Sequence, residues 1–246
     1  MNTRAELYGA GVFTTVRIIN GKPWLWEKHA RRLQHDAARL GMDLSSEDLL
    51  SRIETRVRGS GLTSGRLRLT ISDKRTSELW PGTARNAAVS VTVQTACLNQ
   101  VPQPFHIGTS THLVNSTSPL VGLKTGNYLE PLLSLEEARK KGSHEAIRLN
   151  ERGHVTGACL ANMFWLLGGA LYTPSLATGC LPGTTREFIM ENFAVVEVEA
   201  GLDELKQPDA LFLTSAGLGV IAANEFQGRV MPAADHPILK VIPDAK

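Results

Sequence analysis

Apolar and polar residues alternate in three segments of the first hundred residues, a pattern typical of half-buried β-strands. The segments are V-F-T-T-V-R-I-I at 12–19, G-R-L-R-L-T-I-S at 65–72 and A-A-V-S-V-T-V-Q-T at 87–95. The Asn-Gly pair at 20–21 follows the first segment directly and is a strong hairpin signal. The pattern therefore predicts three strands, with a tight turn after the first.

Two segments between the first and second of these strands carry apolar residues at helical spacing instead. Residues 27–42 form an amphipathic pattern that stops at Gly41, a residue type that commonly ends helices. Residues 45–58 predict a second helix that begins at Ser45 or Ser46, with two acidic residues near its positive end. Together with the strands, these helices predict a two-layer α/β arrangement for the first part of the chain.

The second half of the chain is richer in strands. Residues 127–142 predict a helix with one buried face, closed by Gly142. Its apolar positions are Leu129, Leu132, Leu133, Leu135 and Ala138. The predicted strand regions after it are residues 144–150, 155–167 and 170–174. The segment C-L-P-G-T-T-R at 180–186 then opens another helix.

Two prolines mark the change between these patterns. Pro102 and Pro104 lie in the segment 100–112, which we interpret as a linker. The expected fold class is α/β (α+β) with two domains. Residues 1–105 form a small N-terminal α/β domain, and residues 112–246 form a larger C-terminal domain, strand-rich with helices, that carries Lys124.

Composition narrows the possible functions. The chain has 246 residues, of which 42% are hydrophobic, enough for two domains with their own cores. Its net charge is +2 and it has no long basic run, so binding to nucleic acid is not implied. The scattered cysteines, Cys97, Cys159 and Cys180, fit neither a disulfide framework nor a zinc site, and no metal is expected. Without a signal peptide or long apolar run, the sequence predicts a soluble cytoplasmic protein that does not enter a membrane.

Lys124 is the residue whose setting most suggests chemistry. It lies in S-P-L-V-G-L-K-T-G-N-Y at 118–128, between an apolar turn and the helix predicted at 127–142. A desolvated lysine loses its proton readily and forms Schiff bases with carbonyl compounds. A solvated surface lysine is the simpler interpretation of the same residues.

Several motifs, in order and in register, resemble the class IV aminotransferase family. They are K-T-G-N-Y-L, E-A-I-R-L-N-E-R-G-H-V-T, A-N-M-F-W, L-Y-T-P and L-P-G-T-T-R-E, and they extend over most of the chain. The resemblance implies a two-domain pyridoxal-phosphate enzyme of fold type IV, with a small-molecule substrate. It also implies a homodimer whose sites lie near the subunit interface.

The same resemblance implies which residues bind the cofactor. Lys124 would form the Schiff base, and Arg32, in H-x-x-R-L at 29–33, would grip the cofactor phosphate. The remaining implied contacts are Tyr128 to the phenolic oxygen and Gly183, Thr184, Thr185 and Ser215 to the phosphate. Arginine and a helix N-terminus both suit a phosphate group. Each motif also has a simpler interpretation: a solvated helix face at 31–32, a core tyrosine, and an ordinary helix cap at 183–185.

The chain departs from the family pattern at Gly157. The family motif is V-T-E followed by five residues and N-[IVLM]-F, and its glutamate keeps the pyridine nitrogen protonated. This chain has V-T-G-A-C-L-A-N-M-F, with Asn162 and Phe164 in register. Without the carboxylate, the ring should be a weaker electron sink. A transaminase depends heavily on that sink, whereas a lyase that forms an aromatic product depends on it less.

Two local segments also favour a lyase. V-F-T-T-V-R at 12–17 and C-L-A-N-M-F-W at 159–165 resemble family members that cleave 4-amino-4-deoxychorismate to p-aminobenzoate and pyruvate in folate synthesis. In that case Lys124 also removes a proton from the carbon that bears nitrogen. Thr14, Thr15 and Arg17 would line the substrate side, with Arg17 as the candidate for a substrate carboxylate.

Two alternatives stay open. The first is an aminotransferase of D- or branched-chain amino acids. The second is a degenerate member that binds a ligand without catalysis, which Gly157 and a short N-terminal region would support. The loop at 73–84 lacks the Gly/Arg-rich sequence of many lyases, and Arg75 is the candidate substitute. Family members usually have one more strand before residue 12, so an uncovered sheet edge is expected here.

Overall fold

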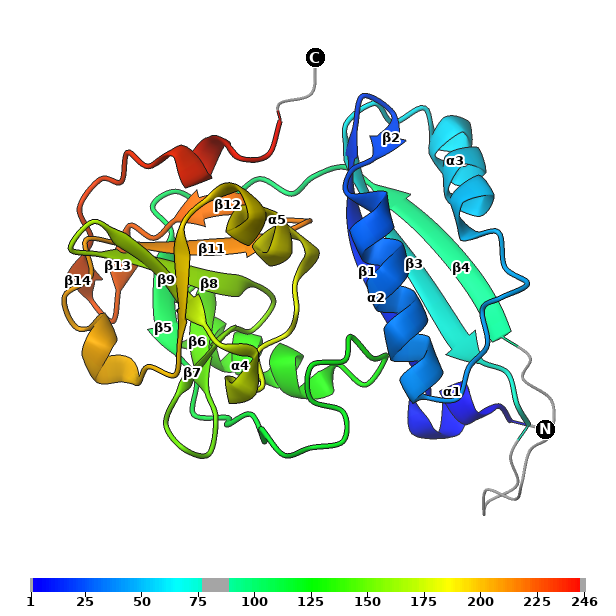
Figure 1. Cartoon of the computed structure of the whole chain (residues 1–246), viewed down its shortest axis with the longest axis horizontal. Helices are drawn as coiled ribbons and strands as arrows, with labels where there is room; N and C mark the ends of the chain where they lie inside the picture. The colour runs from blue at the N-terminus through cyan, green and yellow to red at the C-terminus, as the bar shows by residue number, and fades with distance from the viewer. Residues whose placement is uncertain (1, 77–88, 244–246) are drawn as a thin grey trace. The chain divides into compact units, whose positions relative to one another are not determined.

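The chain divides into two compact units, drawn in Figure 1. The computed structural model describes residues 2–76 and 89–243. The first unit contains the described residues up to Leu98 together with Leu123–Tyr128, and the second contains Asn99–Gly122 and Leu129–Pro243. Lys124 therefore packs with the first unit, although the sequence interpretation placed it in the C-terminal domain. Most of the loop expected at 73–84 lies outside the described residues.

The first unit is an antiparallel sheet with helices on one face. Its described strands are β1 (Gly11–Ile19), β2 (Lys22–Pro23), β3 (Gly65–Asp73) and β4 (Val89–Ala96), in the order β2-β1-β3-β4. Its described helices are α1 (Arg4–Tyr8), α2 (Trp26–Arg39) and α3 (Leu49–Ser60). Helix α2 packs on β1 and α3 packs on β4. The predicted mixed α/β class is confirmed.

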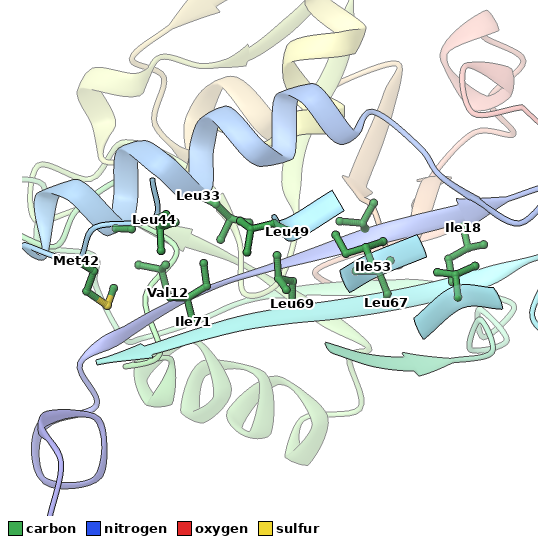
Figure 2. Close-up of a cluster of buried hydrophobic side chains, with 13 residues drawn as sticks. Val12, Ile18, Leu33, Met42, Leu44, Leu49, Ile53, Leu67, Leu69 and Ile71 are labelled. Atoms are coloured by element: carbon green, nitrogen blue, oxygen red, sulfur yellow. The ribbon is translucent and has the colours of Figure 1, made fainter. Parts of the chain in front are cut away.

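Strand alternation builds the core of this unit, shown in Figure 2. Val12 and Ile18 of β1 and Leu67 of β3 are fully buried on the face that the helices cover. Leu33 of α2 and Ile53 of α3 meet them from the other side. Each such side chain contributes roughly 1.5–3 kcal/mol of burial free energy relative to an exposed position. This packing buries one face of β1 under the helices, so the other face, which carries Phe13, Thr15 and Arg17, is available for other contacts.

Helix α3 begins later than the sequence predicts. Asp48 is its N-cap, and its Oδ1 accepts a hydrogen bond from Ser51 N at 3.0 Å. Ser45 does not start the helix, because its N and Oγ both donate to the side chain of Asp43. The local Asp43–Ser45 turn thus replaces the predicted cap, and the predicted start was wrong by about one turn of helix.

The edge of β1 that we expected to be uncovered is partly covered by the segment that carries Lys124. Phe13 N donates to Lys124 O at 2.9 Å, and Gly126 N donates to Gly11 O at 2.7 Å. Thr125 forms an antiparallel bridge with Val12. The segment therefore pairs with β1 as a short strand would, which corrects the sequence-based expectation.

The described part of the second unit contains two five-stranded sheets, ordered β14-β13-β5-β6-β7 and β10-β9-β8-β11-β12. The strands are β5 (His106–Thr109), β6 (Glu145–Leu149), β7 (Val155–Ala158), β8 (Asn162–Leu167), β9 (Ala170–Pro174), β10 (Val195–Val198), β11 (Ala210–Ser215), β12 (Gly219–Ala222), β13 (Glu225–Phe226) and β14 (Arg229–Val230). The helices are α4 (Leu129–Lys140), α5 (Thr184–Asn192) and the 3-10 helices η1 (Leu176–Thr178), η2 (Leu202–Leu205) and η3 (Pro237–Lys240). Among the residues described, none of the helices is both long and apolar enough to span a membrane.

Two hydrophobic clusters hold this unit together. Trp165 and Leu211 belong to one that joins both sheets, while Phe164 and Phe212 belong to another that α5 helps to cover. The predicted strand 155–167 is two strands, because residues 159–161 turn between β7 and β8.

Helix α4 buries a narrower face than predicted. Leu135 and Ala138 are buried against Ala146 and Cys159, and Ser134 is buried beside them. The three leucines Leu129, Leu132 and Leu133 are exposed. The expectation that all five apolar positions share one buried face was wrong, because only the positions one turn apart on the side of β6 meet the sheet.

The N-cap of α3 gives the first prediction. Replacing Asp48 by Ala leaves Ser51 N without its acceptor and should lower the free energy of unfolding by about 0.5–2 kcal/mol. Ser45→Ala is the matched control, because Ser45 caps no helix, and its cost should be smaller. Urea unfolding of both variants measures the difference. Equal losses would mean that the helix starts at Ser45 in solution.

Candidate active site

The amine of Lys124 lies between two aromatic rings of the first unit. Its Nζ donates to Tyr128 Oη at 3.2 Å and lies 4.5 Å from the centroid of the Phe13 ring. The two rings meet edge to face, with centroids 5.1 Å apart. The backbone N of Lys124 donates to Oδ2 of the buried Asp36 at 3.0 Å. Main chain and side chain of this half-buried lysine are therefore both held.

The surroundings of Lys124 weaken its hold on a proton. Burial lowers the pKa of its amine to about 7, and the positive charges of Arg32 and Arg68 add to this effect. The carboxylate of Asp36 acts in the opposite direction. A lysine with an ordinary pKa is almost entirely charged at neutral pH, whereas this one has a large uncharged fraction that can act as a nucleophile or base.

Arg32 belongs to a buried network on the helix-covered face of the sheet. Its Nη2 donates to Thr14 Oγ1 at 2.8 Å, and Thr14 Oγ1 lies 2.7 Å from His29 Nδ1. Burial, followed by the charges of Arg32 and Lys124, holds the pKa of His29 well below its usual value. A neutral His29 can accept the Thr14 proton, so Thr14 is free to accept from Arg32. The neighbouring Arg31 is exposed.

Thr15 and Arg17 lie on the opposite face of β1 from Thr14, because successive strand residues alternate. The structure therefore separates Thr14 from the other two predicted substrate residues. Arg68 of β3 is the cross-strand neighbour of Thr15, and its guanidinium lies 3.5 Å from the centroid of the Phe13 ring. This face offers arginine charges beside an aromatic ring, a combination that suits an aromatic or cyclic carboxylate.

Arg75, the candidate substitute in the altered loop, is occupied elsewhere. Its guanidinium forms an ion pair with Asp73 and donates to Leu40 O. It therefore ties β3 to the end of α2.

The start of α5, in the second unit, is the predicted phosphate-binding segment. Gly183 is the N-cap, and no side chain caps the first turn of the helix. Thr184 and Thr185 are both buried there, and among the described residues Thr185 Oγ1 has no hydrogen-bond partner. A Cβ at position 183 would lie 1.8 Å from Asn162 Oδ1, so only glycine fits. A helix N-terminus with a buried spare hydroxyl suits a phosphate.

Thr214 adds a second spare hydroxyl near this site. It is the Cα partner of Asn162 in the β8–β11 pair, so the two side chains share a face. Asn162 Nδ2 donates to Leu181 O at 2.8 Å, just before Gly183. Thr214 Oγ1 is buried and has no partner within the described residues. The predicted Ser215 lies next in the strand, and its Oγ accepts from Leu218 N at 3.0 Å.

Gly157 lies in β7 with a backbone that favours glycine. Its φ is +138°, and a Cβ there would lie 3.1 Å from Ala161 O. An L-residue at this position would be strained. The absence of a carboxylate at 157 is therefore built into the local backbone.

Sequence reasoning missed Asp36, His29, Arg68 and Thr214. A usable signal existed for the first two, because His29, Arg32 and Asp36 recur at i, i+3 and i+7 on one helix face. For Arg68 the signal was the alternation of residues 65–72, which places it on the face of the strand that does not carry the buried Leu67 and Leu69. No sequence signal distinguished Thr214 from Ser215.

Comparison with known proteins identifies the family. The family model of class IV amino-transferases matches residues 11–226. Aminodeoxychorismate lyase of Bacillus subtilis is 29% identical over 87% of this chain and 77% of its own length. The branched-chain-amino-acid aminotransferase of Escherichia coli K12 is 26% identical over 97% of this chain and 83% of its own. The crystal structure of a “putative 4-amino-4-deoxychorismate lyase” from Legionella pneumophila has a TM-score of 0.86 and 27% identity, and the match covers 98% of this chain and 91% of that one. The chain belongs to the class IV aminotransferase family.

Proposed function

We propose that this protein is a pyridoxal-phosphate-dependent lyase that converts 4-amino-4-deoxychorismate to p-aminobenzoate and pyruvate. The observation that carries the proposal is the amine of Lys124, whose pKa of about 7 and contact with Tyr128 Oη suit the attachment of a carbonyl cofactor. The family membership and the Bacillus subtilis relative, which bears the name aminodeoxychorismate lyase, support it.

The residues of the second unit fit a phosphorylated cofactor. Thr185 Oγ1 and Thr214 Oγ1 are buried donors without partners in the described chain, and a phosphate would satisfy both. Gly183 N already donates to Leu181 O, so Gly183 contributes the absence of a side chain at the start of α5, where Thr184 is the first helical residue. Ser215 follows Thr214 in β11. In the first unit, Arg32 is the proposed phosphate-binding arginine, with its guanidinium oriented by Thr14.

Bound pyridoxal phosphate would supply an aldehyde that condenses with amines and a ring that withdraws electrons from the adjacent carbon. The protein supplies the base. Lys124, when uncharged, can take the proton from the ring carbon that bears the substrate nitrogen. The electrons of that C–H bond form the last double bond of the aromatic ring as the C–O bond to enolpyruvate breaks. Tyr128 holds a hydroxyl within hydrogen-bond distance of the same amine.

Gly157 favours this elimination over transamination. Its φ of +138° and the 3.1 Å approach of a Cβ to Ala161 O make an acidic side chain, which would protonate the ring nitrogen, strained at this position. Elimination depends less on that proton than transamination does, because aromaticity drives it. On the substrate side we place Thr15 together with Arg17 and Arg68, and the positive charges of the two arginines suit the carboxylates of 4-amino-4-deoxychorismate.

Transfer of amino groups is the second candidate. The Escherichia coli relative, a branched-chain-amino-acid aminotransferase, matches more of this chain than the lyase does, at nearly the same identity. In this case Lys124 would have the same role as base, and only the substrate and the return of the proton would differ.

The charges around Lys124 give a prediction for the protein without cofactor. The pKa of Lys124 should be about 7. Asp36→Asn removes a negative charge that favours the ammonium form, so it should lower this pKa, and Arg68→Met removes a positive charge, so it should raise it. The pH dependence of acetylation, followed at each lysine by mass spectrometry, measures both shifts. Lys141 is the internal control, and shifts of one sign in both variants would contradict the assignment.

The spare hydroxyl of Thr185 gives a second prediction. Thr185→Val should leave the unfolding free energy of the cofactor-free protein unchanged or slightly higher, because it removes a buried group without a partner. It should weaken binding of pyridoxal phosphate by about 1.5–3 kcal/mol, the worth of a hydrogen bond to a charged group, and should not affect pyridoxal. Thr173→Val is the control. It loses the bond to Met163 O and should cost stability without changing affinity. Equal affinity for the phosphate form in Thr185→Val would remove Thr185 from the site.

The reaction itself is tested with purified protein and added pyridoxal phosphate. We expect 4-amino-4-deoxychorismate to yield p-aminobenzoate and pyruvate in equal amounts, at about 1–10³ per second. Borohydride reduction should leave the cofactor on Lys124, and Lys124→Ala should lose the product while Lys140→Ala retains it. Transfer of amino groups from alanine, glutamate or a branched-chain donor at such rates, without p-aminobenzoate, would establish the second candidate. No reaction and no adduct would reject both.

A further inference from the structure

Arg148 is a buried arginine next to the glycine that replaces the acidic residue. It lies in the middle of β6 and is 6% exposed. Its Cα partner in the antiparallel β6–β7 pair is Gly157. The register of the pair shifts between Arg148 and Leu149, but Arg148 and Gly157 remain directly opposed. Opposed residues of an antiparallel pair project to the same face, so Arg148 lies on the face on which a side chain at 157 would lie. Because Gly157 has no side chain, the space beside it is available to the side chain of Arg148.

The guanidinium of Arg148 has an unused donor. Its Nη2 is bonded to Glu130 at the start of α4 and lies 3.4 Å from Leu113 O. Its Nε is buried and has no hydrogen-bond partner in the part of the chain that the structure describes. Buried donors of a charged group are rarely left unpaired, because desolvation is costly. The Nε is therefore available to an acceptor outside the described residues.

A continuous set of contacts connects this arginine with the predicted phosphate-binding segment. The Cβ direction of Gly157 leads to Ala161 O and to the Cα of Asn162. The side chain of Asn162 reaches Leu181 O and packs against Gly183, the N-cap of α5. Arg148, with its unused donor, is thus at one end of a path within the second unit whose other end is the predicted phosphate-binding segment.

The other charged and titratable groups near Arg148 are engaged. Glu130 is bound to Nη2, and its side chain is 59% exposed at the surface. The carboxylate of the buried Glu145, on the same strand, accepts from three backbone N–H groups. The thiol of Cys159, the next residue but one after Gly157, is uncharged, because burial raises its pKa. The carboxylates of Glu130 and Glu145 therefore both have partners already.

We propose that Arg148 Nε donates a hydrogen bond to the ring nitrogen of the cofactor and keeps that nitrogen unprotonated. The inference rests on the proposed function, since it requires pyridoxal phosphate in the second unit. A guanidinium cannot give up its proton, so the nitrogen must offer its lone pair. The positive charge also lowers the pKa of the ring nitrogen. A carboxylate at 157 would instead accept a hydrogen bond from a protonated ring nitrogen and would raise the pKa of that nitrogen.

Nitrogen NMR of the holoenzyme, loaded with pyridoxal phosphate that is ¹⁵N-labelled in the ring, tests the proposal without measuring activity. The wild-type nitrogen should resonate as unprotonated at neutral pH. Arg148→Met, of similar length but without donors, should raise the pKa of the nitrogen by about 1–3 units, the usual effect of removing a nearby charge. Arg148→Lys should restore part of the wild-type value.

Two control variants distinguish the effect of the Arg148 Nε donor from the effect of changing any nearby charge. Glu130→Gln alters the partner of Nη2 but keeps the donor at Nε, so the nitrogen should stay unprotonated. Arg152→Met removes an arginine that bonds Ala177 O and Glu199 at the surface, and should change nothing.

The outcomes are distinct. A ring nitrogen that is protonated in the wild-type holoenzyme at neutral pH overturns the role of Arg148 and leaves the proposed function standing, even where Arg148→Met fails to fold. A spectrum that Arg148→Met does not change, in folded and loaded protein, does the same. A wild-type protein that binds no pyridoxal phosphate and yields no borohydride adduct overturns the proposed function, and this inference with it.

Discussion

Three hydrogen bonds of the main chain fix the segment on which the site depends. Phe13 N bonds Lys124 O, Gly126 N bonds Gly11 O, and Lys124 N bonds the carboxylate of Asp36. Each contributes only about 1 kcal/mol to stability, but together they set the position of the Lys124 Cα relative to β1 and α2. The amine then meets the ring of Phe13, whose own backbone forms one of the three bonds. The same hydrogen bonds therefore fix both the position of the amine and the aromatic ring beside it.

Asp36 serves both the backbone and the charge of Lys124. Its carboxylate accepts the Lys124 N–H and also offsets part of the repulsion from Arg32 and Arg68. Burial and two arginines alone would favour the uncharged amine more strongly. A general base works best when its pKa lies close to the working pH, because it must both take and return a proton. The single buried carboxylate keeps Lys124 in that range.

The sequence predicted the elements whose apolar residues repeat regularly, such as the strand at 12–19 and the helix at 27–42. It failed where one side chain chooses between local partners, as Ser45 does when it bonds Asp43 and leaves the cap to Asp48. The exposure of Leu132 on α4 could not be read from spacing, because it depends on how much of the helix the sheet covers.

Residues of the site could be predicted to the extent that a motif names them. Lys124 and Thr185 were predicted in this way; the structure shows an amine of lowered pKa for the first and a buried hydroxyl without a partner among the described residues for the second. The role of Thr14 could not be predicted, because it depends on Arg32 reaching it from another element. The spare hydroxyl of Thr214 becomes visible only when Asn162 is seen beside it.

Gly157 and Arg148 are better explained together than separately. A glutamate at 157 would lie beside Arg148 and pair with it, and such a pair would leave neither group free for a ligand. An arginine on the buried face of a strand is costly unless its donors are used, and Glu130 uses only part of them. The glycine, with its φ of +138°, removes the competing side chain. If Arg148 bonds the ring nitrogen as proposed, one position supplies the space and its cross-strand neighbour supplies the donor, so the missing carboxylate is an exchange of one partner for another.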